Sequence, residues 1–170
     1  MANRTIKIKI NGVNQVIGNL NKINSSLDDM SEPLEESGAY FLMRAYDNFE
    51  SQGSDFGEPW QRLSPATVNW KRRNFPGTEN RPLYRTGKMV NSFKYDLLGR
   101  GSVVITNDAP YFIKHQSPNA ADRRIIPFGN QASSATTIPR RVLLKVDKAG
   151  LNRVVSIFNH WVRKKIQQSF

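Results

Sequence analysis

Hydrophobic residues recur with a helical period in three long stretches of the chain. Within residues 13–29 and 32–51 they fall three and four positions apart, a pattern typical of amphipathic helices with one buried stripe. Residues 147–167 repeat the pattern near the C-terminus. We predict a helix for each stretch, with Ser31 capping the second and Asp147 the third, because short polar side chains favour N-cap positions.

A second pattern, alternation of apolar and polar residues, predicts β-strands. It occurs in residues 4–10 and on both sides of a Gly-Arg-Gly turn, which indicates a hairpin with strands near 93–98 and 102–107. Residues 140–146 are also typical of a strand. The order of these elements predicts an α+β fold in which a small antiparallel sheet carries helices on one face.

Two stretches lack a sustained period and are rich in glycine, proline or small polar residues. We predict that residues 52–85 form a protruding arm containing a short helix at 65–73, started by Ser64 as cap. Thr86 is expected to cap another short helix. Residues 117–137 are predicted to form an extended loop, and the 170 residues are expected to fold as one domain with these two extensions.

Charge is distributed unevenly along the chain. The formal net charge is +11, with 38% hydrophobic residues. Residues 1–58 contain 5 Lys/Arg and 9 Asp/Glu, whereas residues 59–170 contain 20 and 5. A basic field of this kind favours a polyanion or an acidic protein surface as a neighbour, although basic residues also serve simply to keep a surface soluble.

The chemistry needed for catalysis or metal binding is sparse. There is no cysteine, and the two histidines, His115 and His160, do not belong to a metal-binding motif. No phosphate-binding glycine loop or nucleophile motif occurs. We therefore expect no enzymatic activity, cofactor, metal or small-molecule substrate. The N-terminus lacks the apolar run of a signal peptide, and no apolar stretch is long enough to span a membrane, so a soluble protein is expected.

The arm mixes aromatic and basic residues, and this mixture permits two interpretations. Trp60 and Trp70 are interleaved with Lys71, Arg72 and Arg73, as in proteins that stack and neutralise single-stranded nucleic acids. No known nucleic-acid-binding module is matched, however. The alternative is that both tryptophans fold back onto the core and anchor the arm.

Four short motifs occur in one order along the chain: Trp60-Gln-Arg-Leu-Ser-Pro-Ala-Thr67 with Trp70-Lys-Arg-Arg73, Leu83-Tyr-Arg-Thr-Gly-Lys-Met-Val-Asn-Ser92, Tyr111-Phe-Ile-Lys-His-Gln116 and Ile138-Pro-Arg-Arg-Val-Leu-Leu144. In this order they resemble the phage virion morphogenesis family, which includes tail-completion proteins, and the resemblance covers about residues 34–166. The chain departs from the family pattern at two places: Ser117-Pro118 follows the third motif, and Val142 stands where an aromatic residue is usual. The path of loop 117–137 is therefore the least transferable feature.

The resemblance implies a structural virion protein of the tail end or neck, which completes or terminates the tail and joins it to the head. It implies a ring of subunits, with six expected from tail symmetry, assembled in the host bacterial cytoplasm with other neck and tail proteins. The basic residues are expected to meet packaged DNA or an acidic protein surface. The residues expected to contact a subunit, partner or DNA are Trp60, Leu63, Trp70, Lys71, Arg72, Arg73, Arg85, Arg123, Arg124, Arg140 and Arg141.

Overall fold

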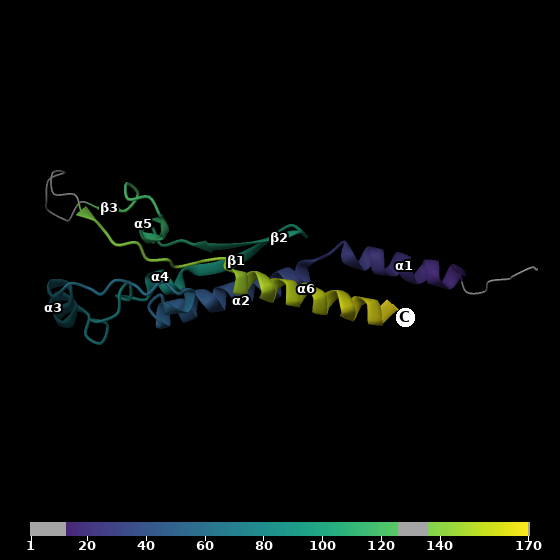
Figure 1. The fold of residues 1–170 in the computed structure, drawn as a ribbon, viewed down its shortest axis with the longest axis horizontal. Helices are drawn as coiled ribbons and strands as arrows, with labels where there is room; N and C mark the ends of the chain where they lie inside the picture. The colour runs from purple at the N-terminus through teal and green to yellow at the C-terminus, as the bar shows by residue number, and fades with distance from the viewer. Residues whose placement is uncertain (1–12, 126–135, 170) are drawn as a thin grey trace, which may run out of the picture.

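The computed structural model describes residues 13–125 and 136–169, and within these ranges the fold is α+β, as predicted (Figure 1). The strand predicted for residues 4–10 lies outside them. The elements are α1 (Val13–Leu27), α2 (Ser31–Glu50), the 3-10 helix η1 (Ser54–Phe56), α3 (Pro65–Asn74), α4 (Lys88–Asn91), β1 (Phe93–Leu98), β2 (Ser102–Asn107), α5 (Phe112–Gln116), β3 (Arg124–Ile125), β4 (Thr136–Thr137) and α6 (Lys148–Ser169).

Helix α2 is the centre of the molecule because its apolar stripe carries much of the core. Ala45 and Phe49 on this stripe are almost completely buried, as the sequence pattern predicted. The β1–β2 hairpin packs against the same helix (Figure 1). Gly38 allows this close approach, because a Cβ there would lie 2.6 Å from the Tyr95 ring and 2.9 Å from Val103.

The predicted hairpin is confirmed with the same strand bounds. Its strands are antiparallel, with Phe93 opposite Asn107 and Leu98 opposite Ser102. Gly99 in the turn has a φ of 65°, a conformation that glycine adopts without steric cost. Period-2 patterning therefore located this element correctly.

Helix α6 packs beside α2, and its first turn is fixed by polar contacts. Asp147 caps it as predicted, since its carboxylate accepts the Gly150 N–H at 2.7 Å. Arg44 on α2 donates to the same carboxylate at 2.7 Å and to Asp55 of η1 at 3.0 Å. These contacts lower the pKa of Asp147, first through the Arg44 hydrogen bond and then through the Gly150 amide. One guanidinium thus joins α2, η1 and the start of α6.

The strand predicted for residues 140–146 is wrong, because no residue of this segment is part of a ladder. A side chain provides the pairing instead. The Gln116 carboxamide oxygen accepts the N–H groups of Leu143 and Leu144 at 2.7 and 3.2 Å, and its NH2 group donates to the Leu144 carbonyl at 2.7 Å. The segment is extended, but at Leu143 and Leu144 its backbone is paired by an amide side chain rather than by a strand.

Two predicted helix caps also differ in detail. Ser31 is already inside α2, and Asp29 accepts its N–H at 3.0 Å and its hydroxyl at 2.6 Å, so the aspartate satisfies the helix start. At α4 the N-cap is Gly87, with a φ of 75°. Thr86 precedes it and only accepts the Lys88 N–H at 3.4 Å.

Part of the loop predicted for residues 117–137 is ordered by a short ladder. β3 and β4 pair antiparallel, with Arg124 opposite Thr137. The Ile138 N–H extends this contact by donating to the Arg123 carbonyl at 3.1 Å. The described part of this loop is therefore tied to the segment that leads into α6.

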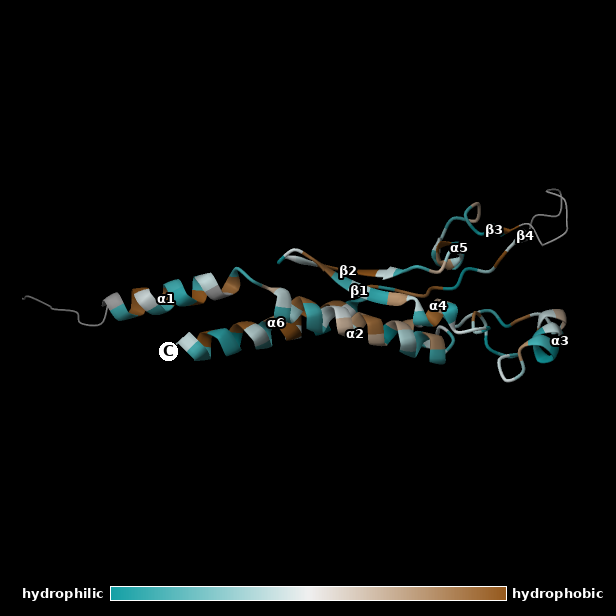
Figure 2. Ribbon diagram, turned by 180° about the vertical axis from the view of Figure 1, so that it is seen from behind, coloured by the Kyte–Doolittle hydropathy of each residue, from teal (hydrophilic) through white to brown (hydrophobic). Residues whose placement is uncertain are grey.

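The elements are arranged along one long axis, with α1 at one end and α3 at the other (Figures 1 and 2). The hairpin, α2 and much of α6 lie between them. None of the helices in the described ranges combines the length and apolar character needed to cross a membrane. The two ends are therefore the parts that project from the central core.

Candidate interaction surface

Trp60 anchors the arm, residues 52–85, to the core. Its side chain is only 7% exposed, its ring centroid lies 5.1 Å from that of Phe49, and its indole N–H donates to the Val142 carbonyl at 3.1 Å. Gly53, with a φ of 93°, makes room, since a Cβ there would collide with the indole. The interpretation that Trp60 folds into the core is therefore correct, and no base or partner can stack on this ring.

Trp70, unlike Trp60, remains exposed. It sits on α3, which begins as predicted: Ser64 accepts the Thr67 N–H at 3.3 Å and Pro65 is the first helical residue. Trp70 is 44% exposed and packs its ring 5.4 Å from that of Phe75. Of the two arm tryptophans, only Trp70 presents a contact surface.

Lys71 differs from the cations beside it because it is buried, with 5% exposure. Its ammonium group donates to the carbonyl oxygens of Arg81 and Tyr84 at 2.7 and 2.9 Å. Desolvation lowers its pKa, partly opposed by the negative charge of Glu79. Lys71 thus fastens α3 to residues 81–84 of the arm, so its ammonium group is turned inward and is not offered to a neighbour as expected.

Three of the cations that the arm exposes lie at the C-terminal end of α3, where Phe75 is the C-cap. Arg72 and Arg73 are exposed on the last turn of α3. Arg85 is also exposed, and its guanidinium lies 5.4 Å from the centre of the Phe75 ring. We call the exposed set Trp70, Arg72, Arg73 and Arg85 the arm surface.

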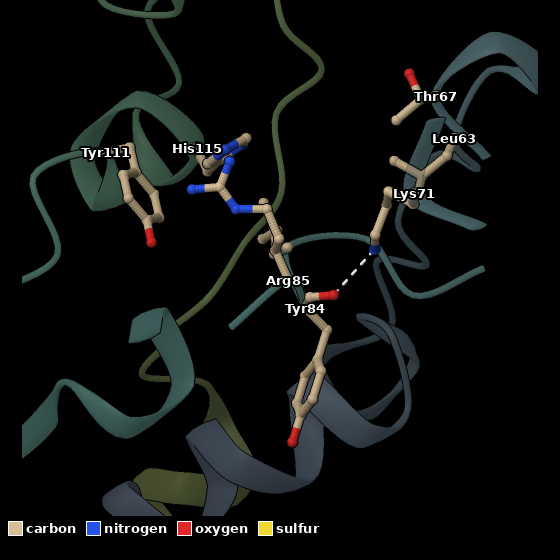
Figure 3. A pocket seen from close by; sticks show the side chains of 8 residues that line it. Leu63, Thr67, Lys71, Tyr84, Arg85, Tyr111 and His115 are labelled. Atoms are coloured by element: carbon tan, nitrogen blue, oxygen red, sulfur yellow. Dashed lines mark hydrogen bonds between the residues drawn. The ribbon is translucent and has the colours of Figure 1, made fainter. Parts of the chain in front are cut away.

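A cavity of about 300 Å³ separates the arm from α5 (Figure 3). Arg85 extends toward His115 across it, and the Lys71 contact with the Tyr84 carbonyl closes another side (Figure 3). Tyr111 and His115, one helical turn apart, share the α5 wall as their spacing predicts. The remaining lining comes from the arm: Leu63, Thr67 and Leu83.

The side chain of His115, although it lines the cavity, is largely buried. Burial, and then the positive charge of Arg141, lower its pKa from 6.5 to about 4, and a hydrogen bond with the Pro139 backbone partly opposes them. The imidazole is consequently neutral near pH 7. The backbone carbonyl of His115 accepts the Arg141 N–H at 3.0 Å, which ties α5 to the extended segment.

The two arginines predicted in the extended segment have different surroundings. Arg140 is partly exposed and pairs with Glu58 at 3.3 Å, and Lys145 reaches the same carboxylate at 2.8 Å. These two cations lower the pKa of Glu58, mainly through the Lys145 hydrogen bond. Arg141 is 5% exposed and donates to the Gln61 carbonyl at 3.3 Å. Both side chains hold the arm against the segment.

Arg123 and Arg124 lie near residue 125, where the described part of the loop ends. Arg124 is exposed on β3, and its carbonyl accepts a hydrogen bond from Lys114 at 3.3 Å. Arg123 is half-buried, with its carbonyl bonded to Ile138. Only Arg124 of this pair has an exposed side chain.

Sequence reasoning missed several residues that position the site. Glu58 forms an ion pair with Lys145 in addition to the one with Arg140, and both pairs join the start of the arm to the extended segment. Asn48 on α2 donates to the Val142 carbonyl at 2.9 Å. Gln116, which holds the extended segment, was visible in the sequence as the last residue of the Tyr-Phe-Ile-Lys-His-Gln motif. Its motif gave the position but not the partner.

No group of three or more metal-ligating side chains occurs in residues 13–125 and 136–169.

A family model described as the phage virion morphogenesis family matches residues 9–163 of the chain. No curated protein and no solved structure matches it. The match spans the core, the arm and most of α6.

Proposed function

The chain belongs to the phage virion morphogenesis family, and from this premise we propose that it is a structural protein of the tail end or neck. It completes the tail so that the tail joins the DNA-filled head. It acts as a subunit of a ring, with six copies as the proposed number. Because the family serves virion structure and assembly, the proposed role requires no catalysis.

The observation that carries this proposal is the braced arm. Trp60 and Lys71 fix its base and its fold, so Trp70, Arg72 and Arg73 are presented on a preorganised element. Tryptophan and arginine are enriched among the residues that dominate protein interfaces, and rigid presentation reduces the entropy lost on binding. An acidic surface of a neighbouring tail or neck protein fits this arm surface.

The alternative, a free nucleic-acid-binding protein, is weakened by the burial of Trp60. Base stacking by two arm tryptophans was its basis, and only Trp70 is exposed. Exposed arginines still permit nonspecific phosphate contact with packaged DNA. Such contact would weaken steeply with salt, because neutralising phosphates releases counterions.

Electron microscopy of lysates from a phage lacking this protein tests the proposal. We expect separate full heads beside separate tails, because the joint is missing. Tails of uncontrolled length would instead assign the protein to tail termination. Normal virions would exclude the proposed function.

Charge reversal tests whether the arm surface makes the contact. Arg72→Glu combined with Arg73→Glu should leave the fold intact, since both side chains are exposed, but should fail to restore joined virions in the deletion phage. Arg100→Glu reverses the charge of an exposed arginine in the hairpin turn and serves as a control for a charge reversal away from the arm. Equal complementation by both variants would remove the arm surface from the proposal.

A further inference from the structure

Helix α1 has an apolar stripe, and the first half of this stripe is exposed to solvent. Val16, Ile17 and Leu20 are 52%, 50% and 54% exposed, although they occupy the hydrophobic face of the helix. Further along the same stripe, Ile23 and Leu27 are half-buried, and α1 packs against α6. The first half of α1 continues past the end of α6 and projects from the body (Figure 1). Among the described residues, the second half of the stripe is therefore packed and the first half remains exposed.

Helix α6 also has exposed apolar residues in its first half. Its buried face includes Ile157 and Trp161, but Leu151 and Val155 are 54% and 58% exposed on one flank of its first half. They are one turn apart and form a second apolar stripe. Figure 1 shows α1 beside the C-terminal part of α6, away from its first turns, so the Leu151–Val155 stripe stays exposed.

The charge around the two stripes indicates their partner. The 15 residues of α1 contain one charged side chain, Lys22, and the α6 stripe is bordered by the uncharged Asn152, Ser156 and Asn159. Lys148 lies at the start of α6, one turn before Leu151. Surfaces with so few charges offer little to a polyanion, but in a chain of net charge +11 they are where two copies approach with least repulsion.

We propose that the first half of α1 from one copy packs on the Leu151–Val155 stripe of α6 from the next copy. The helix pairing already present within the chain is the model for this contact, because the same α1 stripe serves both. The two surfaces differ, so the interface is heterologous, and such interfaces close into rings or continue as filaments. This inference rests on the proposed ring and identifies the surfaces that build it.

Cysteine cross-linking tests the contact directly, because the chain has no cysteine of its own. Leu20→Cys protein is mixed with Val155→Cys protein, so that any disulfide between the two positions joins different copies. We expect a covalent dimer from the mixture and little from either variant alone. Gln15→Cys, at an exposed position on the other side of α1, replaces Leu20→Cys in the matched control. No link to Val155, or a link only between two Leu20→Cys copies, would overturn the proposal.

A second measurement separates this inference from the proposed function. Leu20→Glu should keep the helical circular dichroism signal and lower the light-scattering mass from an oligomer to a monomer. Gln15→Glu adds the same charge outside the stripe and should leave the mass unchanged. A discrete ring that persists in Leu20→Glu would overturn the interface and leave the ring intact. A wild-type monomer at every concentration would overturn both.

Discussion

The two ends of the molecule, the arm and helix α1, project from the same core but differ in how firmly they are held to it. The arm is held by a buried indole, a buried ammonium group and the partly exposed charged pair of Glu58 and Lys145. Helix α1 has few such contacts, and three large apolar side chains in its first half are at least half exposed. The polar, basic end is thus the more firmly built of the two.

This difference separates two kinds of interaction element. An arm whose shape is fixed in the free chain presents its contacts without further ordering, so charge reversal should affect binding and leave stability alone. A helix with a bare apolar stripe gains burial only when a partner arrives. Substitutions at the arm base and in α1 should therefore differ strongly in their effect on the isolated subunit.

The largest effect is expected for Trp60→Ala. Loss of the ring leaves a cavity beside Phe49 and removes the hydrogen bond to Val142, so the free energy of unfolding should fall by about 3–5 kcal/mol. Urea unfolding followed by circular dichroism measures it. Trp70→Ala removes the exposed tryptophan and should cost about 1 kcal/mol or less. Similar losses for both would contradict the assignment of Trp60 as the anchor.

Acid should weaken the arm end through His115. Its pKa falls from 6.5 to about 4 on folding, so the unfolded chain takes up a proton at a pH where the folded chain does not. Stability should consequently decrease as the pH falls from about 6.5 to about 4, by roughly 2 kcal/mol after allowing for solvent near the ring. His115→Gln should flatten this decrease in unfolding experiments across that range. His160→Gln, at an exposed position, is the control.

Lys71→Met should loosen the arm with a smaller global effect. The substitution keeps the aliphatic stem but leaves the Arg81 and Tyr84 carbonyls without their donor, at a cost of about 1–2 kcal/mol. Limited proteolysis should then cut within residues 52–85 sooner than in the wild type. Arg72→Met removes an exposed neighbouring cation and should not change the cleavage rate. Equal protection of both variants would mean that Lys71 does not brace the arm.

The smallest effect on the isolated subunit is expected for Leu20→Asn. Because the side chain is already 54% exposed, the free energy of unfolding measured under monomeric conditions should change by about 0.5 kcal/mol or less. Thermal unfolding at low protein concentration checks this value. A loss comparable to that of Trp60→Ala would show that the α1 stripe is buried within the chain.

Local patterns predicted the elements that depend on local physics. The hairpin, α1, α2, α3 and α6 follow from residue periodicity and from short-range caps such as Ser64 and Asp147. These features need only neighbours in sequence, so one sequence is enough to find them. The family motifs then identified the family, which a family model matching residues 9–163 confirms.

Features that depend on distant partners could not be predicted in the same way. Residues 140–146 have the composition of a strand, but the side chain of Gln116 takes the place of a neighbouring strand. Lys71 is identical in type to an exposed cation, and only the fold brings the Arg81 and Tyr84 carbonyls to it. Neither outcome has a signal in residue spacing.

Gln116 also has a consequence for how this chain can change over evolution. Its amide recognises only the backbone of Leu143 and Leu144, which every residue except proline provides in full. The Gln116 amide therefore fixes the backbone path at Leu143 and Leu144 whatever side chains stand there, whereas the buried side chains of Val142 and Leu143 still require apolar replacements. We expect related chains to keep an amide side chain at 116.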